Sequence, residues 1–246
     1  QHHRVVGRDV LGLDLGRIAA VRHPALVEVV GVGEHPVPFM VRESVSGKPL
    51  SAYMMSGAAP DGLAISIAAQ VASGLAALHA EELCHGLLSD GRILVESIRE
   101  PRVLLVGQGL AGDRWQGGLD HAAPESVRGA AKHPAADIYA LGLVLWQLLH
   151  GRLPWAELGR SQALLRRGRE QPRALRGSAE LRDLLERCLG LDPVLRPSAL
   201  EVVRGLEAHG ARLTAPDGLN LKRRARGITV LDPRVRRELD RWLDGG

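Results

Sequence analysis

The residue types best suited to chemistry gather in the segment CHGLLSDGRILV at 84–95, which holds a thiol, an imidazole, a hydroxyl and a carboxylate. Cys84 and His85 could in principle form a nucleophile and its base. Neighbours along a strand point to opposite faces, so this pair is poorly placed for such chemistry. Cys84 and Cys188 are the two cysteines of the chain, and they lack the spacing of metal ligands. These residue types alone therefore identify no nucleophilic or metal site.

Length and composition are typical of a globular protein. With 246 residues and 45% hydrophobic content, the chain can form one large domain or two small lobes. Its longest apolar stretch, 140–149, is shorter than the roughly 20 apolar residues that span a bilayer. The start QHHRVVG contains no apolar signal segment. Because two distant cysteines make no disulfide framework, we expect a cytoplasmic location.

The net charge of +4 comes almost entirely from arginine. Codon bias in a GC-rich genome would explain it, and so would a basic face for an acidic partner or a nucleic acid. Aromatic residues make up 3% of the chain, which argues against a base-stacking surface. We therefore do not expect nucleic acid as the main partner.

Apolar periodicity predicts a helix, then short strands, then mostly helices. The first helix is expected at 8–21 and ends before Pro24. Short strands follow at 26–32 and 37–41, and again at 93–95 and 103–106 on either side of a charged turn. A long helix is expected at 61–82, a buried helix at 135–150, and amphipathic helices at 158–167, 179–189 and 199–209. After 210 the chain is polar and basic, with a short helix expected at 233–243.

Several segments, in the same order and at the same spacing, resemble the eukaryotic-like serine/threonine kinases of bacteria. CHGLLSDGRILV resembles H-R-D-L-K-P-x-N-I-L-V, LLVGQGLA resembles D-F-G-L-A, and AAPE, DIYALGLVLWQLLHGRLPW and DPVLRPSA follow. The resemblance implies an α+β, protein-kinase-like fold with a mainly α-helical large lobe and a truncated small lobe. We expect a small-lobe remnant at 1–47, a large lobe at 48–209 and a basic extension at 210–246.

The same resemblance shows which chemical groups are replaced. Leu87 stands where the family has its catalytic base, and a leucine cannot accept a proton. Ser89 stands in place of a lysine that steadies phosphate, and Gly107 in place of a metal-binding aspartate. Arg92 stands in place of a metal-binding asparagine, where a permanent cation repels Mg²⁺. Asp90 is a less favoured candidate for a displaced base, because it falls on a turn proline of the family pattern.

The phosphate-covering loop and the lysine strand of the family are also expected to be missing. The chain contains neither G-x-G-x-x-G nor a V-A-I-K-like run, and few residues precede the first helix. We therefore expect no cofactor, no metal and no binding of Mg-ATP. A hinge at 42–47, with Phe39 and Val41 beside it, allows at most weak, metal-independent adenine binding.

Residues with structural roles in the family are retained. Glu125 and Arg196 match a buried ion pair between the A-P-E motif and the segment before the last helix. Asp137 matches the residue that hydrogen-bonds the catalytic-loop backbone, and His85 matches a packing histidine of that loop. The pattern is a retained fold with replaced catalytic groups.

Three functions follow. The first is a catalytically inactive pseudokinase, not an enzyme, that binds a protein partner as a regulatory scaffold through 107–123 and 159–167. The alternative is a divergent serine/threonine protein kinase with residual ATP binding. The third is binding of nucleic acid or an acidic partner through the LKRRAR segment at 221–226, which could equally be a solvated linker.

Overall fold

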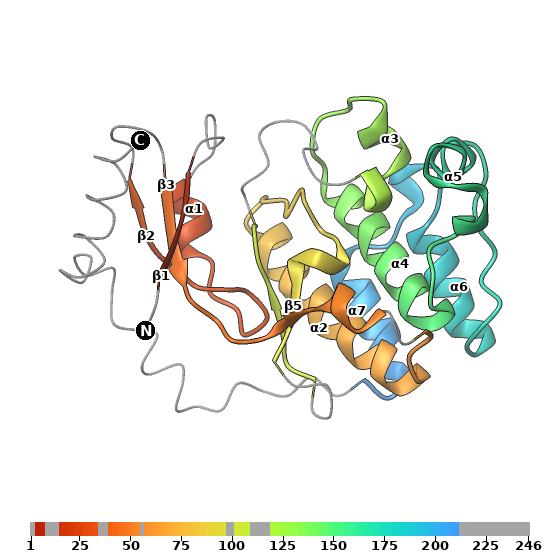
Figure 1. The fold of residues 1–246 in the computed structure, drawn as a ribbon, viewed down its shortest axis with the longest axis horizontal. Helices are drawn as coiled ribbons and strands as arrows, with labels where there is room; N and C mark the ends of the chain where they lie inside the picture. The colour runs from red at the N-terminus through yellow and green to blue at the C-terminus, as the bar shows by residue number, and fades with distance from the viewer. Residues whose placement is uncertain are drawn as a thin grey trace.

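The computed structural model describes residues 3–7, 15–33, 39–54, 57–96, 101–108 and 119–211. Figure 1 shows a small lobe of strands and one helix beside a larger, mostly helical lobe. After a first strand at His3–Gly7, the elements follow the predicted order of one helix, short strands and then helices. The basic segment and the helix expected at 233–243 lie outside the described residues.

The small lobe is a three-stranded antiparallel sheet with one helix. Its strands are β1 (His3–Gly7), β2 (Val29–Gly33) and β3 (Phe39–Glu43), in the order β1-β3-β2. Helix α1 (Leu15–Ala20) packs Ile18 and Ala19 against Val29 and Met40. The described helix thus covers the second half of the predicted one, and the two predicted strands begin two or three residues later than expected.

Strand β1 lies before the first helix, at residues to which the sequence analysis assigns no element. It pairs antiparallel with β3 along its whole length, and its register places Arg4 opposite Arg42. The run HRVVG contains only two β-branched residues and is short, so its strand propensity alone is weak. Antiparallel pairing with β3 (FMVRE) supplies the backbone hydrogen bonds that hold this segment in a strand.

A second sheet joins the two lobes. It consists of β4 (Lys48–Pro49), β5 (Ile93–Val95) and β6 (Val103–Leu105), in the order β4-β5-β6. The chain just before β2 reaches this sheet: the Val27 amide donates to the Leu105 carbonyl at 3.0 Å, and the Leu105 amide donates to Ala25 at 2.7 Å. These backbone bonds fix the two sheets on either side of a shared cleft.

The core of the large lobe is formed by α2 (Asp61–Ala80), α4 (Pro134–His150) and α7 (Ala199–Ala208), with α2 packed against both α4 and α7. Helices α3 (Pro124–Val127), α5 (Arg160–Arg167) and α6 (Ala179–Cys188) surround them. Short 3₁₀ turns lie at η1 (Leu50–Ala52), η3 (Asp90–Arg92), η4 (Leu119–His121), η5 (Ala156–Leu158) and η6 (Pro193–Leu195).

Helix α4 is defined at both ends by its sequence. The His133 side chain caps it by accepting a hydrogen bond from the Ala135 amide, and Pro134 follows in the first turn. Gly151 ends it in the left-handed conformation at φ 76°. Between these ends almost every residue is buried, as the apolar pattern predicts.

Helix α2 is long and apolar enough to cross a membrane by length and composition, with a mean hydropathy of 1.6. In this fold it is a core helix, because Ile67, Val71 and Leu75 are fully buried against its neighbours. Its apolar character is therefore explained by packing inside the large lobe.

Candidate functional site

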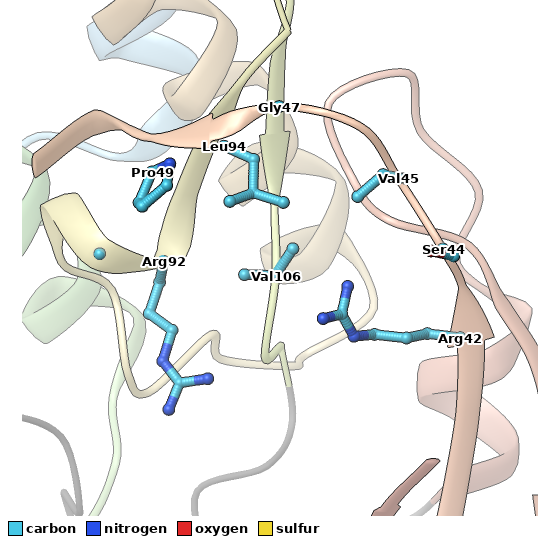
Figure 2. A pocket seen from close by; sticks show the side chains of 9 residues that line it. Arg42, Ser44, Val45, Gly47, Pro49, Arg92, Leu94 and Val106 are labelled. Atoms are coloured by element: carbon cyan, nitrogen blue, oxygen red, sulfur yellow. The ribbon is translucent and has the colours of Figure 1, made fainter. Parts of the chain in front are cut away.

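A cleft of about 420 Å³ opens between the end of β3 and the strands β5 and β6. Its apolar lining includes Val45, Leu94 and Val106. Two arginines line it as well: Arg42 extends from β3 toward Val106, and Arg92 extends from η3 (Figure 2). The cleft thus combines an apolar wall with two cationic side chains.

The predicted catalytic loop reaches this cleft through Gly91 and Arg92. The Asp137 side chain holds the backbone of the loop in place. The carboxylate of Asp137 accepts hydrogen bonds from the amides of His85 and Gly86, each at 2.8 Å, and lies 3.0 Å from His79 Nε2. The Leu87 amide donates to Nδ1 of His85 at 3.3 Å, and the Leu87 side chain is buried. The Asp137 carboxylate therefore fixes the loop backbone through these hydrogen bonds. The position predicted for the family base holds the buried, apolar side chain of Leu87.

His85 is neutral under ordinary conditions. Complete burial lowers its pKa to about 4, against the opposing effect of the Asp137 carboxylate. Its Nε2 has no hydrogen-bond partner among the described residues. Cys84, its neighbour, is also unactivated, because burial raises the pKa of the thiol to about 12. The Cys84–His85 pair consequently offers no thiolate at neutral pH.

Arg92 and Gly107, the two predicted metal positions, lie against each other. A Cβ atom on Gly107 would lie 3.0 Å from Nη1 of Arg92. Gly107 has φ +87°, in the left-handed region that favours glycine. The next residue, Gln108, is buried and donates from Nε2 to the Val27 carbonyl at 2.7 Å. The guanidinium of Arg92 therefore lies over Gly107, the residue predicted to replace the family's metal-binding aspartate.

These residues do not fit a protein-bound Mg²⁺. Magnesium takes oxygen ligands, and Arg92 and Gly107 offer no side-chain oxygen. In the described part of the chain, no group of three or more His, Cys, Asp or Glu residues is arranged to hold a metal ion. A guanidinium in a cleft is instead suited to phosphate oxygens, which it can bind through two parallel hydrogen bonds.

The other two polar residues of the loop lie on its large-lobe side. Ser89 precedes η3 in an extended conformation and makes no side-chain capping bond there. Asp90 accepts a hydrogen bond from Gln147 Nε2 at 3.2 Å, and Gln147 Oε1 lies 3.2 Å from His121 Nε2. Burial lowers the pKa of His121. Asp90 thus belongs to a hydrogen-bonded chain that runs through Gln147 on α4 to His121 in η4, which the sequence does not predict.

Glu125 and Arg196, paired in the sequence analysis, lie together in the structure. Arg196 donates to both carboxylate oxygens of Glu125, at 2.6 and 2.8 Å. It also donates to the carbonyls of Ala135 and Gly190, each at 2.8 Å, and its guanidinium lies 4.8 Å from the ring centroid of Tyr139. The ion pair joins the start of α3 to α4 and the segment before α7.

Sequence reasoning missed the cationic side of the cleft. The segment at 42–47 was interpreted as a hinge with apolar neighbours, yet Arg42 lines the cleft. The available signal was the arginine that follows the apolar residues FMV in this strand.

Comparisons with known proteins agree on one family. The protein kinase domain family matches residues 14–205. The serine/threonine-protein kinase PrkC of Bacillus subtilis (strain 168) is 28% identical over 220 residues, covering 83% of this chain and 34% of PrkC. PkaA of Streptomyces coelicolor, another serine/threonine-protein kinase, is 30% identical over 198 residues, covering 75% of this chain and 36% of PkaA. The chain thus spans about a third of the length of these relatives.

Among solved structures, Rad53 residues 1–466 in complex with AMP-PNP has the same fold, with a TM-score of 0.67. At 23% identity, the match covers 82% of this chain and 56% of that one. The predicted α+β, protein-kinase-like fold is therefore confirmed.

Two predictions are corrected by these comparisons. The prediction that the chain is not an enzyme is contradicted, because the matching family and both bacterial relatives are protein kinases. The prediction that Mg-ATP is not bound conflicts with the same finding, because a protein kinase acts on ATP.

Proposed function

Because the chain belongs to the protein kinase domain family, we propose that it is a divergent serine/threonine protein kinase domain that binds an adenine nucleotide in the cleft between its two sheets. The observation that carries this proposal is that the apolar side chains of Leu94 and Val106 and the side chains of Arg42 and Arg92 line the same cleft. An adenine ring needs the apolar part, and a chain of phosphates needs the cationic part.

The adenine ring is the part of the ligand best matched by the described residues. Leu94 and Val106 offer flat apolar contact, and Val45 closes one edge. The backbone at 44–47 supplies carbonyl and amide groups at the rim. The Rad53 structure supports this assignment, since a protein of the same fold holds AMP-PNP.

The phosphates would lie on Arg92. Its guanidinium lies over Gly107, beside the place where family members hold metal. Charge-assisted hydrogen bonds from a guanidinium to phosphate are among the stronger polar contacts in proteins. Magnesium that arrives bound to ATP keeps phosphate oxygens as ligands and requires no carboxylate at 92 or 107.

The described residues support nucleotide binding more directly than they support phosphoryl transfer. Leu87 supplies no base, and Asp90 is the carboxylate that lies within the same loop segment. A hydrogen bond from Gln147 Nε2 to Oδ2 orients that carboxylate. Asp90 is therefore the group to replace when transfer to a protein substrate is measured.

The division of the chain is also part of the proposal. We place the small lobe at 1–47, the large lobe at 48–209 and an extension at 210–246, since β4 at Lys48–Pro49 already belongs to the second sheet. A cytoplasmic location is retained, because Cys84 and Cys188 are both free thiols.

The test is calorimetric titration of ATP, with excess Mg²⁺ and then with chelator, into the wild type, Arg92→Ala and the control Arg173→Ala. Arg173 is exposed and lies outside the cleft. We expect Arg92→Ala to weaken ATP binding by about tenfold, equal to about 1.4 kcal/mol. The control should bind like the wild type.

Two results would contradict the proposal. Failure of the wild type to bind ATP in either buffer would remove nucleotide binding altogether. Binding that is lost on chelation and is unaffected by Arg92→Ala would assign the phosphates to a metal site instead of to the arginine.

A further inference from the structure

Exposed aliphatic side chains gather where the turn η6 leads into α7. Val194 is 87% exposed and Leu195 is 75% exposed, although both are aliphatic. Leu191 and Leu200, on either side of this turn, are 36% and 51% exposed. Single exposed aliphatic residues are ordinary on protein surfaces, whereas four within one short segment form a patch that marks a contact site. We call these four residues the η6 patch.

The turn that carries the η6 patch is held in place from both sides. Asp192 Oδ1 accepts a hydrogen bond from the Val194 amide at 3.0 Å. Arg196, directly after the turn, is buried and donates to both carboxylate oxygens of Glu125. A capping box then begins α7. Because these bonds fix the backbone of the turn, its aliphatic side chains cannot reach the core by a local rearrangement. They can be buried only by a further segment of chain.

Charged groups of both signs border the η6 patch. Asp192 and Glu201 are exposed within and just after it. Hydrogen bonds from Ser198 lower the pKa of Glu201, and the nearby charges of Arg187 and Arg204 lower it further, so this carboxylate is ionised at neutral pH. The border therefore suits an apolar occupant that is itself flanked by charges of both signs.

The last residues of this chain have a matching pattern. In DPRVRRELDRWLDGG at 232–246, the apolar residues Val235, Leu239, Trp242 and Leu243 recur at the spacing i, i+4, i+7 and i+8. This spacing predicts a helix with one apolar stripe. The dipeptide Asp-Pro at its start is typical of a helix N-cap followed by proline at the first helical position.

The predicted helix also has the expected charges beside its apolar stripe. At 100° per residue, Arg236 falls next to Leu243 at one side of the stripe, and Glu238 falls next to Trp242 at the other side. An arginine and a carboxylate thus flank the stripe, in agreement with the carboxylates and arginines that border the η6 patch.

The length of the chain permits the two to meet. The described chain ends at Ala211, just after α7, whereas the η6 patch lies at the start of α7. The ten residues of α7 measure about 15 Å along the helix axis. The residues from 212 to 234 can span up to about 75 Å when extended. A tether also raises the local concentration of the segment to about the millimolar range, so a small apolar patch suffices for docking.

We infer that residues 232–243 dock as an amphipathic helix on the η6 patch of the same chain, with their apolar stripe against Val194 and Leu195. A second copy of the chain is a less suitable occupant. Four aliphatic side chains are few beside the roughly 20–30 residues that each partner contributes to a stable interface between separate chains. This inference is independent of nucleotide binding in the cleft.

The experiment measures amide hydrogen exchange by mass spectrometry on the whole chain. The first test variant replaces the patch, Val194→Ser with Leu195→Ser, at two exposed positions. The reciprocal variant replaces the stripe, Leu239→Ser with Trp242→Ser. The matched control is Leu175→Ser, at a residue that is 79% exposed elsewhere on the large lobe. Circular dichroism checks that each variant remains folded.

We expect the amides at 233–243 to exchange at least about tenfold more slowly in the wild type and the control than in either double variant, because docking protects them. The reciprocal variant should also speed exchange at 191–197. Exchange of 233–243 at the rate of an unprotected peptide in the wild type would overturn the inference, as would equal protection in the wild type and the patch variant.

Light scattering over a range of protein concentrations separates the two occupants. We expect a monomer at every concentration, with protection of 233–243 that does not depend on concentration. A dimer that forms as the concentration rises and that the patch variant abolishes would overturn the inference and assign the η6 patch to a second copy of the chain. No nucleotide is present in these measurements, so their failure leaves the proposed function unaffected.

Discussion

Replacing Arg196 by alanine should destabilise the large lobe strongly. The Arg196 side chain is completely buried and donates two hydrogen bonds to Glu125 and one each to the carbonyls of Ala135 and Gly190. The replacement leaves Glu125, which is 17% exposed, with a largely buried and unpaired charge. Breaking one partner of a buried ion pair costs about 3–5 kcal/mol. We expect a loss near the middle of that range, about 4 kcal/mol, because two backbone carbonyls also lose their donor.

The assay is urea unfolding followed by circular dichroism, with Arg187→Ala as the matched control. Arg187 pairs with Asp183 on an exposed helix face, and such pairs contribute about 0.3–0.5 kcal/mol. The double variant Glu125→Gln with Arg196→Met should recover part of the loss, because no charge remains unpaired. If Arg196→Ala lowered the free energy of unfolding by less than about 1 kcal/mol, the reasoning would be refuted, because removing one partner of a buried ion pair is expected to cost several times more.

Two further predictions concern the loop beside the cleft. First, the pKa of His85 is lowered from 6.5 to about 4, so the unfolded state binds more protons and stability falls as the pH drops below about 6.5. At pH 5 the loss should be about 2 kcal/mol, and urea unfolding of His85→Asn should be less sensitive to acid; equal acid sensitivity in both proteins would contradict this. Second, Gly107→Ala should cost about 1–2 kcal/mol, because its φ of +87° disfavours a side chain. Gly62→Ala, in the first turn of α2 with open space around it, should cost nothing measurable in the same melts, and equal losses at both sites would contradict the backbone argument.

The fold of the large lobe could be predicted well because its signals are local and strong. Helix α4 is apolar on all faces and is flanked by Pro134 and Gly151, so its type and both ends are encoded in neighbouring residues. Strand β1 could not be predicted in the same way. Its pairing with β3 joins segments more than thirty residues apart, and short strands are specified by their partners more than by their own residues.

The residues of the candidate site could be predicted from the sequence, whereas the cationic lining of the cleft could not. The resemblance identified Leu87, Arg92 and Gly107 as replaced positions of the family motifs, and the structure places Arg92 over Gly107. The sequence argument then treated each replacement as the loss of a catalytic group. It could not anticipate Arg42 at the same cleft, because the direction of a side chain at the end of a strand depends on the register of the sheet.

The replacements at 92 and 107 are better understood as one change than as two losses. An aspartate at 107 beside Arg92 would form an ion pair with the guanidinium and neutralise it. It would also require a side chain where the backbone has φ +87° and where a Cβ would lie 3.0 Å from Arg92 Nη1. Glycine at 107 avoids both the ion pair and the strained side chain. The positive charge of Arg92 is therefore not neutralised by residue 107, and its side chain has room over the loop. Under the proposed function, such a cleft has exchanged one asparagine and one aspartate, which the resemblance implies as metal ligands, for a cation that can hold phosphate directly.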